Sequence, residues 1–236
     1  MKHILIISFL FLISCKETNV SVVEFESHHI QLNINVDNHS AKLSDSGKMR
    51  VSKGWNLFTL NGFVDIHSFN IDDILIEYQS FSSKEPSNIP IQFRDKIPSG
   101  NPHEEEQIIA FQSKSADIKS FSISYSGTFY ENVEDVHFSN ENVGREVTAT
   151  ISEQGAYFSP AATYYPMGNE SMASFKLTAN IPDSWESISD GNRLSNETKD
   201  GRKIQSWGNP FKNDGNMFMA APFVTKSTWV DDIEVA

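Results

Sequence analysis

The sequence predicts an all-β protein built from antiparallel sheets. Apolar side chains recur at every second position in four segments, 30–36, 121–125, 147–151 and 175–181. This alternation is typical of strands with one buried face and one wet face, which antiparallel sheets accommodate. Turn-forming groups separate such segments and favour hairpin connections. These groups are Asp45-Ser46-Gly47, Asn61-Gly62, Asp190-Gly191-Asn192, Asp200-Gly201 and Asn213-Asp214-Gly215.

Three segments are less regular. Residues 80–102 contain four prolines and many polar side chains, which predicts a long connection between strands. A helix beginning near Pro102 and a strand over Gln107–Gln112 are equally compatible with the residues that follow. At the end of the sequence, residues 229–235 predict a strand that has just begun and has no partner after it.

The first residues predict export. Lys2 and His3 precede an apolar run, Ile4–Ile13, which is broken only by Ser8. The end of this run continues into the sequence Leu12-Ile13-Ser14-Cys15. A run of about ten residues is roughly 15 Å long as a helix, whereas about 20 residues are needed to span a bilayer. We therefore interpret residues 1–14 as a lipoprotein signal peptide, cleaved before Cys15. The alternatives are an ordinary signal peptide with a chance cysteine, or a buried thiol in a cytosolic protein.

Cys15 is then the lipidation site, and residues 15–24 form a lipidated tether. Two or three acyl chains on this thiol would hold the protein lastingly on a membrane. Because Cys15 is the sole cysteine of the sequence, no thiol remains for a disulfide. Lys16 replaces the aspartate that signals inner-membrane retention, so we expect a protein of the bacterial cell envelope, lipid-anchored in the outer membrane.

Composition narrows the partners further. The formal net charge is −12, and 39% of the residues are hydrophobic, including 17 phenylalanines. This apolar content is enough for a sizeable core. The acidic charge argues against nucleic acid as a partner, and against attraction to an anionic lipid surface, because phosphate groups bind clustered lysines and arginines.

The sequence offers no residue that we predict to be catalytic or to bind a metal. A zinc peptidase needs two histidines one helical turn apart with a glutamate between them. His103-Glu104-Glu105-Glu106-Gln107 begins with that spacing but carries glutamine in place of the second histidine. His28 and His29 are adjacent, so on a strand they point to opposite faces and cannot chelate one ion together. No Gly-x-Ser-x-Gly elbow or Gly-rich phosphate loop occurs in the sequence.

One stretch resembles a known family. Its features are, in order, Gly155–Phe158, Tyr164-Tyr165-Pro166, a strand from Phe175 into Ile181-Pro182-Asp183-Ser184-Trp185, Ser189-Asp190-Gly191, Gly201–Trp207, and a strand ending at Pro222-Phe223-Val224. This order is similar to the N-terminal β-domain of family M1 zinc metallopeptidases, the aminopeptidase N-like group. The alternative is a generic β-sandwich without a relation to this family. The resemblance implies a large antiparallel β-sandwich, or saddle, over residues 25–226, with residues 227–236 beginning a following, missing domain.

The resemblance also implies a function. In that family this domain precedes a thermolysin-like catalytic domain, so zinc and the cleavage of peptide substrates are expected in the missing domain and not in this chain. Well-known members use a glutamine or glutamate of the N-terminal domain to hold the substrate's free amine, for which Glu153 and Gln154 are the nearest candidates. Both residues fit equally as polar residues at a strand edge. The alternative function is a stand-alone envelope lipoprotein that uses the β-domain for binding or scaffolding.

Overall fold

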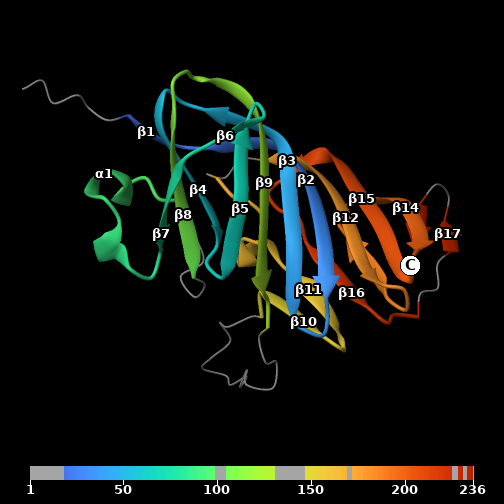
Figure 1. The fold of residues 1–236 in the computed structure, drawn as a ribbon. Coiled ribbons are helices and arrows are strands. Elements are labelled where there is room, and N and C mark those ends of the chain that lie inside the picture. Colours follow the sequence, from blue (N-terminus) through green and yellow to red (C-terminus); the bar gives the residue numbers. More distant parts are fainter. Residues whose placement is uncertain are drawn as a thin grey trace, which may run out of the picture.

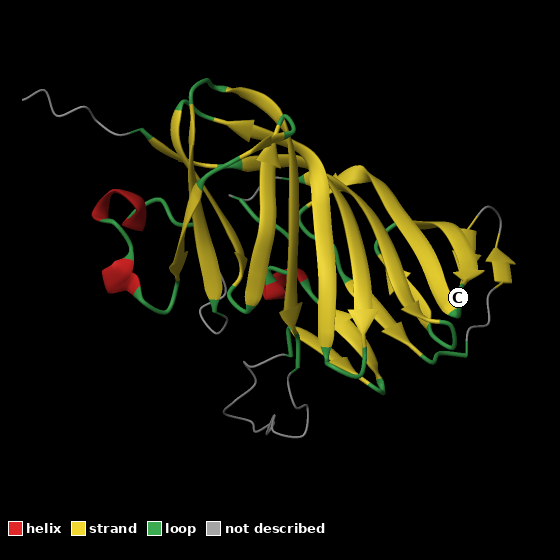
Figure 2. Ribbon diagram, in the orientation of Figure 1, coloured by secondary structure: helices red, strands yellow, loops and turns green. Residues whose placement is uncertain are grey.

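The computed structural model describes residues 19–98, 105–130, 147–168, 172–224, 228–230 and 233–235. Strands account for most of these residues, as Figures 1 and 2 show, and helices are confined to short turns. The prediction of an all-β protein is therefore confirmed.

The main sheet has eight strands in the order β14-β15-β12-β2-β3-β9-β5-β6. Their bounds are β2 (Glu24–Asn35), β3 (Ser40–Val51), β5 (Val64–Ile71), β6 (Ile74–Leu75), β9 (Asp117–Thr128), β12 (Ala173–Pro182), β14 (Asn192–Lys199) and β15 (Arg202–Asn213). All neighbours are antiparallel except β12 and β2, which run parallel over Ser174–Asn180 and Ser27–Asn33. The expectation of purely antiparallel sheets was wrong at this pair, which a long crossover connection joins, and also where Val20–Val22 runs parallel to Trp55–Leu57.

Two smaller sheets cover the main sheet. The first has the order β1-β4-β8-β7, with β1 (Val20–Val22), β4 (Gly54–Asn61), β7 (Tyr78–Ser82) and β8 (Glu106–Ser113). The second has the order β10-β11-β16-β13, with β10 (Ala149–Ser152), β11 (Gly155–Phe158), β13 (Glu186–Ser189) and β16 (Phe218–Ala221). The helical turns are η1 (Pro86–Asn88), α1 (Ile91–Arg94) and η3 (Pro160–Ala162).

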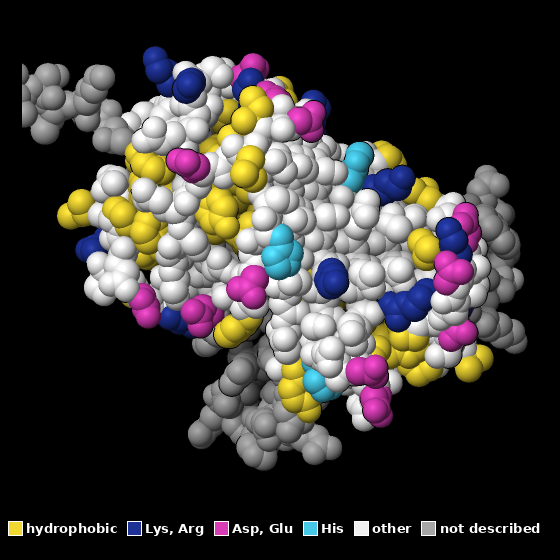
Figure 3. Space-filling view, viewed as in Figure 1, with side chains coloured by type: hydrophobic (Ala, Val, Ile, Leu, Met, Phe, Trp, Pro, Cys, Tyr) yellow, Lys and Arg dark blue, Asp and Glu magenta, His cyan; other side chains and the backbone are white. Residues whose placement is uncertain are grey.

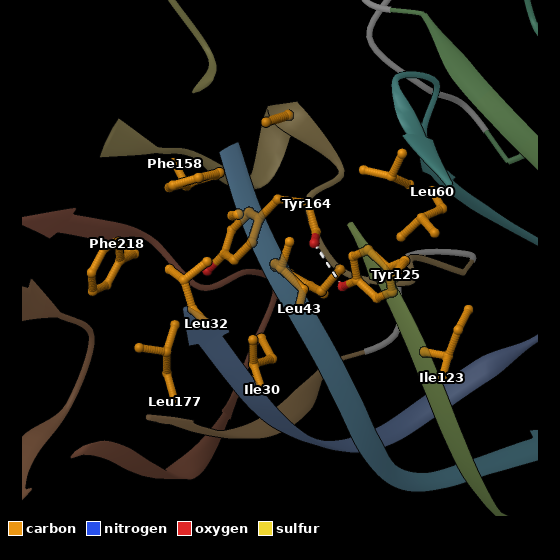
Figure 4. Packing of buried hydrophobic residues seen from close by; sticks show 14 of the residues in the cluster. Ile30, Leu32, Leu43, Leu60, Ile123, Tyr125, Phe158, Tyr164, Leu177 and Phe218 are labelled. Carbon is orange, nitrogen blue, oxygen red and sulfur yellow. Dashed lines mark hydrogen bonds between the residues drawn. The ribbon is translucent and has the colours of Figure 1, made fainter. Parts of the chain in front are cut away.

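The core lies between the main sheet and the smaller sheets. Alternation directs Ile30, Leu32 and Ile34 of β2 inward, where each is 1% exposed, as predicted. Figure 4 shows side chains of β2, β3, β9 and β12 converging there on residues from the smaller sheets. A second, smaller cluster packs α1 against the first small sheet through Leu57 and Phe93. Burial of both clusters supplies the main driving force for this fold, since no disulfide is available.

Four local predictions have clear outcomes. The predicted turn at 45–47 is wrong, because these residues continue β3. Residues 80–98, the described part of the predicted connection, are more regular than expected, with the end of β7 followed by two helical turns. The segment 107–112 belongs to β8, so the strand alternative holds. The last described residues form two strands, β17 (Thr228–Val230) and β18 (Ile233–Val235), which pair with each other, so the expected partnerless strand was wrong.

Candidate functional site

A buried histidine–aspartate pair lies at the centre of the main sheet. His28 of β2 and Asp45 of β3 approach to 2.6 Å between Nδ1 and Oδ2, and their side chains are 3% and 0% exposed. The other carboxylate oxygen of Asp45 accepts the backbone N–H of His29 at 3.1 Å. Because both oxygens of the buried carboxylate are hydrogen-bonded, the cost of burying it is offset.

The surroundings of this pair are aromatic. The His28 ring stacks on Phe175 at 5.0 Å with 10° between the planes, and Phe25, Phe121 and Tyr165 pack around it at centroid distances of 5.0 to 5.9 Å. A histidine held by a carboxylate can act as a general base, but it must reach the proton that it removes. Enclosure of His28 leaves no room for a substrate, so we assign the pair a structural role.

His29 lies on the opposite face of β2 and is exposed. The prediction that His28 and His29 point to opposite faces of the strand is therefore confirmed.

Buried tyrosines organise the stretch that carries the family resemblance. The Tyr164 hydroxyl donates to the Asn216 carbonyl at 3.0 Å and accepts from Asn216 Nδ2 at 3.1 Å. Tyr165 accepts the Asn216 N–H at 3.1 Å, and Tyr125 donates to the Tyr164 carbonyl at 2.8 Å, the contact drawn in Figure 4. Burial raises the pKa of Tyr125 and of Tyr164 well above the usual value of 10, so both remain neutral donors. This network ties η3 to the loop before β16.

Glu153 and Gln154, the candidates for amine binding, form the tip of the hairpin between β10 and β11. Both side chains are exposed, and the Gln154 N–H donates to the Ser152 hydroxyl at 3.2 Å. A carboxylate in this position can bind an ammonium group presented by a neighbouring domain or a ligand. The role of these two residues stays a prediction.

A hollow of about 610 Å³ opens near the base of the same hairpin, where β3 and β5 begin and β9 ends. Phe63 and Tyr130 line it and are 61% and 53% exposed. Lys42 and Asp65 add one charge of each sign, and four serine or threonine hydroxyls complete the wall. The lining can hold a polar ligand by hydrogen bonds and ring contacts. None of the described residues that line it is a histidine or a cysteine.

The described residues do not fit a zinc ion. Within the part of the chain that the structure describes, no group of three or more histidine, cysteine, aspartate or glutamate side chains could hold a metal. His103 lies outside the described residues, and Glu106 and Gln107 begin β8, where a strand cannot give the one-turn spacing of a helical zinc motif.

The predicted lipidation site, Cys15, also lies outside the described residues. Among the helices that the structure describes, none is long and apolar enough to cross a membrane.

Comparison with known proteins gives one kind of match. No protein-family profile and no curated protein matches this sequence. Among solved structures, an M1 zinc metallopeptidase from Deinococcus radiodurans matches with a TM-score of 0.58 and 9% identity, over 90% of this chain and 46% of that chain. A mutant of the enzyme bound to a Tyr-Ser-Ala substrate gives the same values. A two-domain M1 zinc metallopeptidase mutant bound to L-arginine matches with a TM-score of 0.54 and 8% identity over the same shares.

The chain thus spans about half the length of the solved structures that it matches. Identities this low concern the fold alone, and the order of strands expected over residues 155–224 is the order found. The described residues have the fold of the N-terminal region of M1 zinc metallopeptidases.

Proposed function

We propose that this chain is the non-catalytic N-terminal β-domain of a membrane-anchored M1-type zinc metallopeptidase. The observation that carries the proposal is the match of 90% of the chain to 46% of a peptidase of that family. On this account an aminopeptidase catalytic domain follows residue 236. That domain would bind zinc and cleave peptides.

The proposal includes the location of the enzyme. Acylation of Cys15 would anchor it in the bacterial cell envelope, in the outer membrane. The support is the short apolar run before Leu12-Ile13-Ser14-Cys15 and the lysine that follows.

The β-domain would contribute to peptide binding through its hairpin tip. Glu153 is exposed next to Gln154, so its carboxylate is free to meet the amino group of a peptide held in the following domain. If the pair acts in this way, Glu153→Gln should raise KM for free-amine substrates with little change in kcat, because the lost interaction is made equally in the ground state and the transition state. Glu197→Gln, on the exposed edge strand β14, is a matched control.

A direct test compares two proteins made from the same gene. The first runs from Met1 to the natural stop codon, and the second ends at Ala236. The longer protein should release p-nitroaniline from amino-acid p-nitroanilides, lose activity with 1,10-phenanthroline and regain it with zinc. The shorter protein should fold, by circular dichroism, without hydrolysing the substrate. A folded product of the whole gene without zinc-dependent activity would favour the alternative, a stand-alone envelope lipoprotein used for binding or scaffolding.

A further inference from the structure

Two consecutive apolar side chains are exposed at one end of the domain. Ile74 and Leu75 form the edge strand β6 and are 66% and 70% exposed. Successive residues of a strand point to opposite faces, so neither face of β6 is covered. Asp72 and Asp73 build the preceding tight turn, with φ values of 49° and 63°, and present β6 at its tip. Single exposed apolar residues are ordinary, but an adjacent exposed pair on a tight turn requires an explanation.

A hollow adjoins Leu75 of this pair. Its volume is about 570 Å³, and it is lined by Trp55, Leu75, Ile76, Tyr78 and Ala110 together with the polar or charged side chains Glu77, Gln79, Gln112 and Lys114. In Figure 3 the hydrophobic side chains gather on this side of the molecule, over the region of β6, β7 and β8, whereas the face over β3, β2 and β12 is mostly uncharged and polar. The exposed pair and the apolar side chains of the hollow therefore form one surface with a polar rim, which we name the β6 surface.

The start of the folded chain is attached beside the β6 surface. Val20 of β1 pairs with Trp55 of β4, and the Trp55 N–H donates to the Asn19 carbonyl at 2.9 Å. The Asn19 side chain in turn donates to the Lys53 carbonyl at 3.1 Å. Residue 19 is thus held in place, and Trp55 is both the wall of the hollow and the partner of β1.

The distance from this point to the lipid is short. Five peptide units separate Cys15 from Val20, and a fully extended chain spans at most about 3.3–3.6 Å per residue, or roughly 17 Å in all. A lipid on Cys15 therefore keeps β1, and Trp55 with it, within roughly 17 Å of the bilayer surface. The opposite end of the 12-residue strands β2 and β3 lies roughly 40 Å away.

The charges near the β6 surface suit this placement. Lys53 and Lys114 are exposed there, and Lys114 and Glu77 both line the hollow. Lys119 bridges Asp72 at 3.0 Å. Asp73 and Asp117 are also exposed at this end, so three cations stand against four acids there, whereas the whole chain carries −12. The contact would depend on apolar burial and on the anchor, so an uncharged bilayer should suffice.

We propose that the β6 surface lies on the lipid bilayer, with Ile74 and Leu75 inserted among the headgroups and Trp55 at the interface beside them. Tryptophan favours the headgroup region because its ring can contact the acyl chains while its N–H faces water, and aliphatic side chains gain by leaving water. This inference rests on the proposed lipidation of Cys15. It adds the orientation of the domain, with the turn between β2 and β3 directed away from the membrane.

The test uses the acylated mature protein in phosphatidylcholine vesicles. Since the acylated Cys15 has no free thiol, Leu75→Cys introduces one site for the fluorophore NBD, and Asn38→Cys places the same probe in the exposed turn at the far end. We expect the probe at residue 75 to brighten at least twofold on vesicles, to shift to the blue, and to be quenched by nitroxide-labelled lipid. The probe at residue 38 should show none of these changes.

The possible outcomes distinguish the orientation of the domain from the lipidation of Cys15 on which it rests. If mass spectrometry finds the acylated N-terminal peptide and the two probes respond alike, the orientation is wrong while the anchor stands. If the N-terminal peptide carries no lipid, the anchor and the orientation both fall. Leu75 is 70% exposed and β6 is at the sheet edge, so the labelled variant should keep the circular dichroism spectrum of the parent.

Discussion

Removing the buried carboxyl group of Asp45 should destabilise the domain strongly, because two buried hydrogen-bond donors lose their acceptors. Asp45→Ala leaves His28 Nδ1 and the His29 N–H without the acceptors that they contact at 2.6 and 3.1 Å. Each buried unsatisfied group costs about 1–3 kcal/mol, so the two groups together cost about 2–6 kcal/mol. We therefore expect the free energy of unfolding to fall by about 4 kcal/mol.

The assay is urea unfolding at pH 7, followed by the fluorescence of buried Trp185, in a Cys15→Ala form that carries no lipid. With a urea slope of about 2 kcal/mol/M, the midpoint should fall by about 2 M. Asp45→Asn is the matched control, because its amide oxygen can still accept the His29 N–H, and it should lose less than half as much.

A double variant isolates the pair. His28→Leu leaves the Asp45 carboxyl group buried without its partner, whereas His28→Leu combined with Asp45→Ala removes both side chains of the pair. The double variant should therefore be destabilised by clearly less than the sum of the two single variants. Additive losses, or a loss below about 1 kcal/mol for Asp45→Ala, would refute the structural role assigned to this pair.

Three further predictions concern other parts of the chain. Tyr164→Phe should lower the free energy of unfolding by about 1–3 kcal/mol in urea, because its buried hydroxyl makes two hydrogen bonds, while Tyr130→Phe, at a half-exposed ring, should change it by less than about 0.5 kcal/mol. Burial raises the pKa of Glu186, but hydrogen bonds from Lys203 and Gln205 outweigh it and hold that pKa below its usual 4.5. The resulting stability is present above pH 4.5 and lost as the pH falls through the lower, folded-state pKa, so unfolding curves of Lys203→Met should change less between pH 7 and pH 3 than those of the parent. Cys15→Ala should abolish incorporation of labelled fatty acid and release the protein from the membrane fraction. Continued labelling would contradict lipidation at Cys15.

Local pattern was enough to predict the strands but not all of their ends. The alternation over 30–36 and 175–181 has one physical cause, the burial of one sheet face, so it could be read directly from the residues. The group Asp45-Ser46-Gly47 has the residue types of a turn, yet it lies within β3. The contact of Asp45 with His28, 17 residues away, decides its conformation. Gly47 is required for another reason, since a Cβ there would lie 1.9 Å from the Ser27 carbonyl oxygen.

Features that depend on distant contacts could not be predicted from local sequence. The parallel pairing of β12 with β2 joins residues about 147 positions apart, and Asn216 reaches Tyr164 across 52 positions. The β6 surface could not be predicted, because two adjacent apolar residues are equally compatible with a buried strand. Only the sheet order shows that Ile74 and Leu75 lie at an edge. Glu153 and Gln154 could be named only through the family resemblance, and their hairpin position is compatible with either role.

The measurement that tests the central claim most directly is the nucleotide sequence immediately after the Ala236 codon. The account predicts an open reading frame that continues and encodes a His-Glu-x-x-His motif, the two histidines and the glutamate of a zinc peptidase. A stop codon at that position would contradict it, and would leave a lipoprotein that has the fold of a peptidase domain without the peptidase.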